Sequence, residues 1–162
     1  MPTVAFDALP DMSRVWVFAA DRPVRDAAAA RLLAAVDGYL ARWHAHGHPL
    51  TSAREWRDDR FLIVAVDQTE AHASGCSVDG LFRTLRALEP EIGASLVAGG
   101  RVFYRDGDGE VCVVSREEFG ALGARGAVSL DTTVFDPSVQ TLSEWYDRFE
   151  TTVGRSWHKG LL

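Results

Sequence analysis

The sequence predicts an α+β fold with a ferredoxin-like core, whose elements follow the order β-α-β-β-α-β. Two observations support this class. The two most apolar strands, 14–20 and 60–66, are suited to the middle of a sheet, where both faces are covered. Two further strand-like segments meet at Asp58-Asp59, a hairpin turn that argues against a doubly wound parallel sheet.

Length and composition place the chain among ordinary globular proteins. Its 162 residues are suited to one domain, and 47% hydrophobic with 25% charged residues is a typical balance. We expect a single globular domain over residues 1–162, with the ferredoxin-like core at 1–109 and a C-terminal strand and helix extension at 110–162. The net charge of −6 disfavours a nucleic-acid partner, because neutralising phosphates needs a basic surface.

No segment predicts a membrane span or a secretory signal. No apolar run approaches the roughly 20 residues of a membrane helix, and no basic segment followed by an apolar one opens the chain. The two cysteines, at positions 76 and 112, have neither a metal-ligand spacing nor the number of a disulfide framework. We therefore expect a cytoplasmic protein without a cofactor.

Start and stop residues define the elements of the core. Asp21 can cap a helix that runs to about Ala45, ended by Gly47. Its apolar residues form one stripe: Ala29, Leu32, Leu33, Val36, Leu40 and Trp43. Strands follow at 51–57 and 60–66, and a second helix runs from Ser77 to Pro90.

The rest of the chain carries equally local signals. Strands 102–105 and 110–114 flank the hairpin signal Asp106-Gly-Asp-Gly109. Ser115–Glu118 and Thr141–Glu144 both have the capping-box pattern, so we expect a helix after each of them. Thr132–Phe135 is expected to form a short edge strand.

The run Asp67–Gly80 is the strongest candidate for a site, because it joins an apolar strand to a helix start. Cys76 lies one residue before the expected N-cap, where backbone N–H groups can bind an anion or lower the pKa of a thiol. Cys76 is expected to act as nucleophile, redox thiol or ligand, with His72 or His46 as its base. The residues expected to bind a ligand are Asp67, Ser74, Gly75, Ser77 and Asp79.

The predicted topology brings other polar segments to this loop. In a ferredoxin-like sheet, strand 60–66 ends beside the end of the first helix and beside the hairpin after strand 102–105. We therefore expect three segments at one end of the sheet, namely 43–48, 67–76 and 106–108.

Each of these residues also has a purely structural interpretation. Cys76 can be a buried, inert thiol, and His72 a solvated loop residue, whereas Cys112 is expected in the core. His44, His46 and His48 have the spacing of metal ligands on a strand but straddle a helix end, so we expect no metal there.

Several familiar motifs are excluded. The stretch from Asp106 resembles a calcium loop, but Val111 stands where that loop needs glycine, so a hairpin turn explains it. The sequence contains no Gly-x-x-x-x-Gly-Lys phosphate loop, no Gly-x-Gly-x-x-Gly turn and no Gly-x-Ser-x-Gly elbow. Nucleotide hydrolysis and serine-hydrolase chemistry therefore lack their usual residues.

Five strings resemble a family of small bacterial proteins that are sometimes labelled ABC transporter ATPases. They are Arg14-Val-Trp-Val-Phe-Ala-Ala-Asp-Arg-Pro23, Ala45-His-Gly47, Arg60-Phe-Leu-Ile-Val-Ala-Val-Asp67, Ala73-Ser-Gly-Cys-Ser-Val-Asp79 and Ser156-Trp-His-Lys159. The resemblance spans nearly the whole chain but implies no catalytic residue. The ATPase label has no support in the motifs, because the lysine-containing phosphate loop is missing.

Two functions remain open. The first is an enzyme or binder of a small anionic ligand, at the 67–80 loop facing the His44–His48 helix end. The second is a non-catalytic interaction module, a homodimer joined by exposed tryptophans and the apolar tail 156–162. The tail is also expected to dock on the domain itself or on a second subunit, and His158 or Lys159 would then enter the same site.

Overall fold

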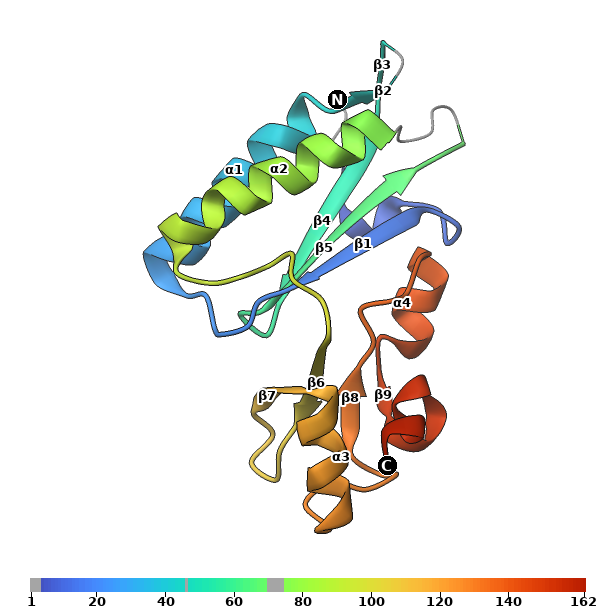
Figure 1. The fold of residues 1–162 in the computed structure, drawn as a ribbon. Helices are drawn as coiled ribbons and strands as arrows, with labels where there is room; N and C mark the ends of the chain where they lie inside the picture. Colours follow the sequence, from blue (N-terminus) through green and yellow to red (C-terminus); the bar gives the residue numbers. More distant parts are fainter. Residues whose placement is uncertain (1–3, 46, 70–74) are drawn as a thin grey trace. The chain divides into compact units, whose positions relative to one another are not determined.

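The computed structural model describes residues 4–45, 47–69 and 75–162, with their side chains except those of residues 45 and 75–77. The described residues form four α-helices, a three-stranded and a four-stranded antiparallel sheet, and a short two-stranded ribbon (Figure 1). The predicted α+β class is therefore confirmed. The chain divides into two compact units, Met1–Val97 with Val139–Trp145, and Ala98–Ser138 with Tyr146–Leu162.

The sheet of the first unit has the strand order β1-β5-β4. These strands are β1 (Arg14–Ala19), β4 (Thr51–Arg57) and β5 (Phe61–Asp67). The predicted hairpin between β4 and β5 is confirmed, with Asp58 and Asp59 both in the left-handed region at φ 57° and 56°. β5 lies in the middle because residues on both of its faces are apolar and buried. β1 lies at the sheet edge instead, where Arg14 forms a bridge with Thr141.

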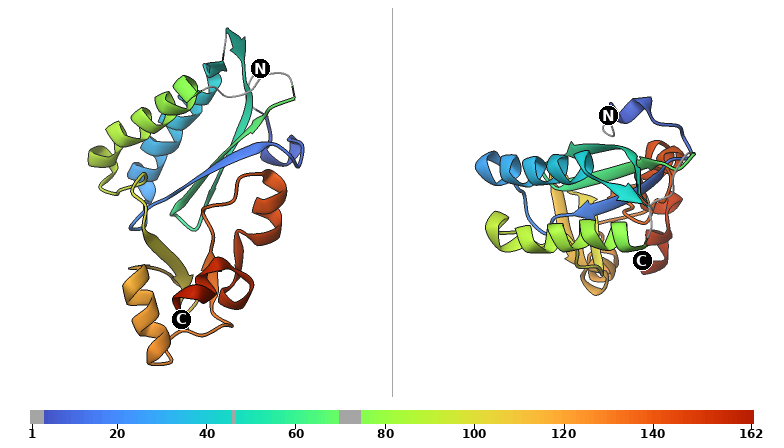
Figure 2. Two further views of the ribbon diagram at one scale, coloured as in Figure 1. Left: turned by 45° about the vertical axis from the view of Figure 1, so that its right-hand side comes forward. Right: turned by 90° about the horizontal axis from the view of Figure 1, so that it is seen from above.

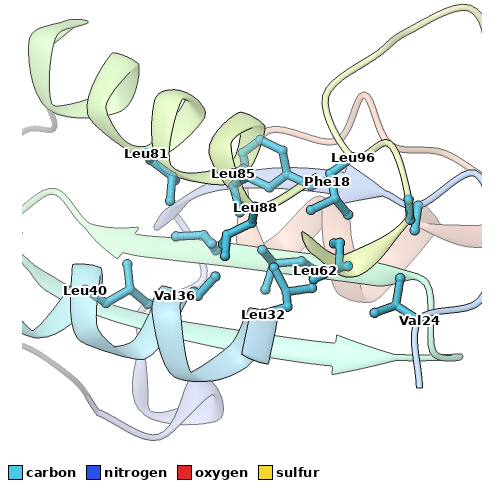
Figure 3. Packing of buried hydrophobic residues seen from close by; sticks show 14 of the residues in the cluster. Phe18, Val24, Leu32, Val36, Leu40, Leu62, Leu81, Leu85, Leu88 and Leu96 are labelled. Atoms are coloured by element: carbon cyan, nitrogen blue, oxygen red, sulfur yellow. The ribbon is translucent and has the colours of Figure 1, made fainter. Parts of the chain in front are cut away.

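Two long helices cover one face of this sheet. Helix α1 (Asp26–Ala41) and helix α2 (Gly75–Ile92) run side by side (Figure 2). Their apolar side chains point toward one another above Leu62 and Phe18 of the strands, as Figure 3 shows for Leu32, Val36, Leu40, Leu81, Leu85 and Leu88. The apolar stripe predicted for the first helix is thus confirmed as core.

The predicted helix ends need three corrections. α1 begins at Asp26 rather than after Asp21, because the Asp21 carboxylate instead accepts the N–H of Ser95 at 2.8 Å. It ends at Ala41, since the chain turns back there into strands β2 (His44–Ala45) and β3 (His48–Pro49). α2 begins at Gly75, before Ser77, and continues past Pro90 to Ile92.

The second unit is built on a sheet of order β7-β6-β8-β9. Its strands are β6 (Arg101–Arg105), β7 (Val111–Ser115), β8 (Thr133–Phe135) and β9 (Glu150–Thr152). Helix α3 (Arg116–Ala124) follows β7. Helix α4 (Leu142–Arg148) precedes β9 in the chain, and its residues up to Trp145 belong to the first unit. The capping box predicted for α3 is confirmed, because the side chains of Ser115 and Glu118 each accept the other's backbone N–H.

The ferredoxin-like topology is not confirmed. The strand expected to complete the first sheet, β6, pairs with β7 and β8 in the second sheet. β8 is also not an edge strand, because it lies between β6 and β9. A hairpin motif specifies its own turn but carries no information about which sheet the hairpin joins.

The C-terminal tail packs onto the second unit. After β9 the chain forms two short 3₁₀ helices, Val153–Arg155 and Trp157–Leu161. Leu161 lies against the buried cluster that contains Val102 and Phe119. Among the described residues, no helix combines the length and the apolar character needed to cross a membrane.

Candidate ligand site at the end of the first helix

The end of α1 and the end of β5 lie at the same end of the first sheet. After α1 the chain folds back on itself, so that the N–H of Leu50 donates to the carbonyl of Trp43 at 2.9 Å. β4 begins at the next residue, and its Thr51 pairs with Asp67, the last residue of β5. Two of the three polar segments expected together therefore share this end. The third, Asp106–Asp108, belongs to the second unit.

Helix α2 begins beside the last turn of α1. The two helices run in opposite directions, since Arg31 early in α1 forms a 2.9 Å ion pair with Glu91 late in α2. At the other end, a Cβ on Gly80 would overlap the hydroxyl of Tyr39. Glycine therefore allows the close approach of α2 to Tyr39, and a larger residue would force the Tyr39 hydroxyl to shift.

An open pocket of about 260 Å³ lies at this helix end, lined by Tyr39, Arg42, Trp43 and His44. Residues 39, 42 and 43 share one face of the helix end, because residues three and four apart are neighbours on a helix. The rings of Tyr39 and Trp43 are 5.7 Å apart, and Trp43 is buried against Trp16 with a ring separation of 6.0 Å. The rings of Tyr39 and Trp43 therefore form an aromatic wall of the pocket, and Trp43 is packed in place by Trp16.

Two arginines lie near Tyr39: Arg42 lines the pocket, and the charge of Arg83 acts on the Tyr39 phenol. Arg42 and Arg83 are exposed, and within the described part of the chain neither has an ion-pair partner. Burial raises the pKa of Tyr39, while the charges of Arg83 and Arg42 act in the opposite direction. A phenol is already protonated at neutral pH at its ordinary pKa of 10.0, and the raised pKa of Tyr39 acts in the same direction, so its hydroxyl can donate a hydrogen bond.

His44 presents one ring nitrogen for binding. Its Nδ1 contacts the carbonyl oxygen of Arg42, and a carbonyl can only accept, so Nδ1 carries the proton. In the neutral ring, Nε2 is then an acceptor, and the side chain is exposed. Nε2 of this exposed side chain can accept a hydrogen bond from a ligand.

The predicted site residues form three groups: those whose side chains are described, those described by their backbone alone, and those outside the described residues. Asp67 forms hydrogen bonds within its own segment of the chain. Its Oδ1 accepts the backbone N–H of Thr69 at 2.9 Å and the Thr69 hydroxyl at 2.7 Å. Asp79 is exposed on α2, one residue beyond the first turn in which it was expected. The backbones of Gly75, Cys76 and Ser77 form that first turn, but their side chains lie outside the described residues.

Three predicted site residues, His46, His72 and Ser74, lie outside the described residues altogether. The Cys–His pairing predicted for this loop therefore stays a prediction. So does a ligand set of His44, His46 and His48, because only the first and last of these are described. Within the described ranges, no group of three or more His, Cys, Asp and Glu side chains is placed to hold a metal ion.

Two other sequence interpretations can be checked in the second unit. Asp106 Oδ1 accepts the N–H groups of Asp108 and Glu110 at 2.9 and 3.0 Å, which is the predicted hairpin turn. Cys112 is half-buried rather than in the core, and its sulfur lies 3.6 Å from Asp106 Oδ2. It sits on β7, an edge strand of its sheet, where packing covers it only in part.

Sequence reasoning missed Tyr39, Arg42 and Arg83 as site residues. The signal for the first two was present, because they stand near the C-terminal end of the helix at the spacing that puts side chains on one face. Arg83 could be recognised only after the packing of α2 against α1 was known.

Comparison of the chain with protein-family models, with curated proteins and with solved structures found no match.

Proposed function

We propose that the protein is a cytoplasmic binder of a small anionic ligand, held in the pocket where α1 ends and α2 begins. One observation carries the proposal. Two arginines without carboxylate partners among the described residues stand beside an aromatic pocket, next to the start of an 18-residue helix.

Three kinds of donor are available to an anion here. The first backbone N–H groups of α2 have no partner within the helix, and they carry the positive end of its dipole. The guanidinium groups of Arg42 and Arg83 supply charge and paired N–H donors. The Tyr39 hydroxyl supplies a neutral donor. This set matches carboxylate or phosphate oxygens, and the rings of Tyr39 and Trp43 can contact an apolar part of the ligand.

Inorganic phosphate and the ring signals of His44 provide a direct test. The carbon-bound proton signals of His44 should shift saturably as phosphate is added at constant ionic strength. Arg42→Gln should weaken the affinity by about tenfold, since it removes a charged hydrogen-bond donor. Arg86→Gln is the matched control, because Arg86 is an exposed arginine of α2 that does not line the pocket.

Either of two results would remove this site. One is a His44 signal that does not respond to phosphate. The other is an equal loss of affinity in Arg42→Gln and Arg86→Gln, because that pattern indicates general screening rather than a local contact.

The thiol version of this function adds Cys76 as nucleophile, redox thiol or ligand, with His72 or His46 as its base. Its support is the position of Cys76 in the first turn of a helix. Alkylation against pH, followed separately for the two cysteine peptides by mass spectrometry, tests it with Cys112 as the internal reference. A Cys76 that reacts with an ordinary thiol pKa of about 8.5 removes the activated thiol while leaving the anion site open.

The alternative function is a homodimeric interaction module joined by the tail. The tail already packs on its own unit through Leu161, and the ring of Trp157 is stacked on His158. Both contacts use apolar surface that a second copy would need, so we favour the ligand site. An unchanged mass in solution after removal of residues 156–162 would count against the homodimer.

A further inference from the structure

A second pocket, of about 370 Å³, lies in the second unit and is lined mainly by the chain from β9 to the tail. It contains three cationic side chains, Arg148, Arg155 and Lys159, and one carboxylate, Asp136. The lining residues therefore carry a net charge of +2, in a chain whose net charge is −6. This local excess of positive charge needs a physical explanation.

The carboxylate of Asp136 is not available to a ligand. It is buried, and its Oδ2 accepts from Nη1 of Arg148 at 2.6 Å. Its Oδ1 accepts from the indole Nε1 of Trp157 at 3.2 Å and from the N–H of Ser138 at 3.0 Å. Asp136 thus holds Arg148 and Trp157 in place as a wall of the pocket, and its charge is offset by Arg148.

The other two cations have no such role. Arg155 and Lys159 are exposed, and no carboxylate of the described residues pairs with either of them. Neither side chain caps a helix or donates a hydrogen bond within that part of the chain. Both side chains line the same pocket, and like charges repel each other, so their shared position favours an external anion.

The walls around these cations are fixed. The ring of Trp157 stacks on His158 at 3.9 Å, with 22° between the planes, and Arg116 lies 5.2 Å from its centroid. Its indole N–H is held by Asp136, as described above. The hydroxyl of Ser156, which also lines the pocket, accepts the N–H of His158 at 3.1 Å. A pocket whose walls are already held loses less entropy on binding than a mobile surface does.

We propose that this pocket is a second binding site, separate from the one at the end of α1, for the dianionic end of a phosphate monoester. Arg155 and Lys159 contact the phosphate oxygens and supply the net positive charge, while Arg148, paired with Asp136, forms part of the wall. The charge of −1.5 to −2 on a phosphate monoester at neutral pH matches the net charge of +2 at the lining. Arginine offers a planar fork and lysine a point charge, and both are established phosphate ligands.

Lys159 allows a site-specific test because it is the only lysine of the chain. Reductive methylation with ¹³C-formaldehyde labels two amines, Lys159 and the N-terminus, and gives two resolved methyl signals. Added inorganic phosphate should shift the Lys159 signal saturably, and the N-terminal signal serves as the internal control. Succinate at the same ionic strength should leave the Lys159 signal in place, because its two charges are further apart.

Variants separate a local site from general attraction. Arg155→Gln should weaken phosphate binding by about tenfold. Arg125→Gln should leave it unchanged, since Arg125 is an exposed arginine of the same unit that does not line the pocket. A Lys159 signal that ignores phosphate overturns the proposal. An equal loss of phosphate affinity in Arg155→Gln and Arg125→Gln also overturns it. If succinate shifts the Lys159 signal as much as phosphate does, the site is not specific for a phosphate group. Arg42→Gln changes none of these readouts, so failure here is distinguishable from failure of the site at α1.

Discussion

Nδ1 of His158 lies 2.7 Å from the hydroxyl oxygen of Ser156, in the interior of the second unit. The Ser156 hydroxyl donates to the carbonyl of Val153 at 3.3 Å, so its single proton is already used. The tautomer with the proton on Nδ1 satisfies both groups, because Nδ1–H then donates to the Ser156 oxygen while the hydroxyl proton stays directed at the carbonyl of Val153. Nε2 is then a buried lone pair that has no hydrogen-bond partner among the described residues.

This arrangement predicts a loss of stability in mild acid. Burial lowers the pKa of His158 from 6.5 to about 4, because the charged ring would place an unpartnered N–H in the interior. The unfolded chain takes up this proton below pH 6.5, and the folded chain only near pH 4. The stabilisation is thus complete above pH 6.5, and it declines by about 3 kcal/mol as the pH falls to 4.

Urea unfolding of the protein and of His158→Asn between pH 7 and pH 4 measures this contribution. Asparagine can replace the Nδ1 donor but does not titrate, so the variant should show a shallower decline over this range. If the free energy of unfolding of the two proteins falls equally with pH, folding does not lower the pKa of His158, and the prediction is wrong.

A second prediction concerns the contact between Gly80 and Tyr39. In Gly80→Ala the new Cβ overlaps the Tyr39 hydroxyl, which should cost about 1 kcal/mol despite the higher helix propensity of alanine. In a Tyr39→Phe background the hydroxyl is gone, and the same substitution should be neutral or stabilising. A double-mutant cycle by chemical unfolding measures the difference, and additive effects would contradict the contact.

A third prediction concerns Asp136. Replacing it with asparagine removes the counter-charge of Arg148 and should destabilise the protein by about 2 kcal/mol. Asp131→Asn is the control, since that carboxylate is exposed and its loss should change stability by less than about 0.5 kcal/mol. Chemical unfolding of both variants, followed by tryptophan fluorescence, gives the comparison. Equal stabilities would mean that Asp136 does not hold the pocket together.

Local features of the fold could be predicted from the sequence, whereas long-range pairing could not. The hairpin at Asp58-Asp59 and the capping box at Ser115 depend on neighbouring residues alone, and both are present. Besides β7, strand β6 pairs with β8, about thirty residues away, and that choice depends on packing that no local pattern encodes. The prediction that strand 102–105 joins the first sheet was wrong for this reason.

The candidate site shows the same division. Turn residues and apolar periodicity predicted a helix end near Ala45 and a helix start at Ser77, within four residues of the observed end at Ala41 and start at Gly75. Tyr39 and Arg83 became visible as site residues only through the packing of α2 on α1. The pocket around Lys159 depends on how the tail folds onto β9 and Asp136, which a terminal segment does not reveal in its own sequence.

The amide ¹⁵N–¹H signals of residues 75–80 during a titration with inorganic phosphate test the central claim most directly. An anion bound at the start of α2 should shift these signals saturably in the wild-type protein, together with the ring signals of His44. Arg42→Gln should reduce both shifts in parallel, and Arg86→Gln should preserve them. Amides of α2 that stay unmoved by phosphate, or that move equally in Arg42→Gln, would contradict an anion site at this helix end.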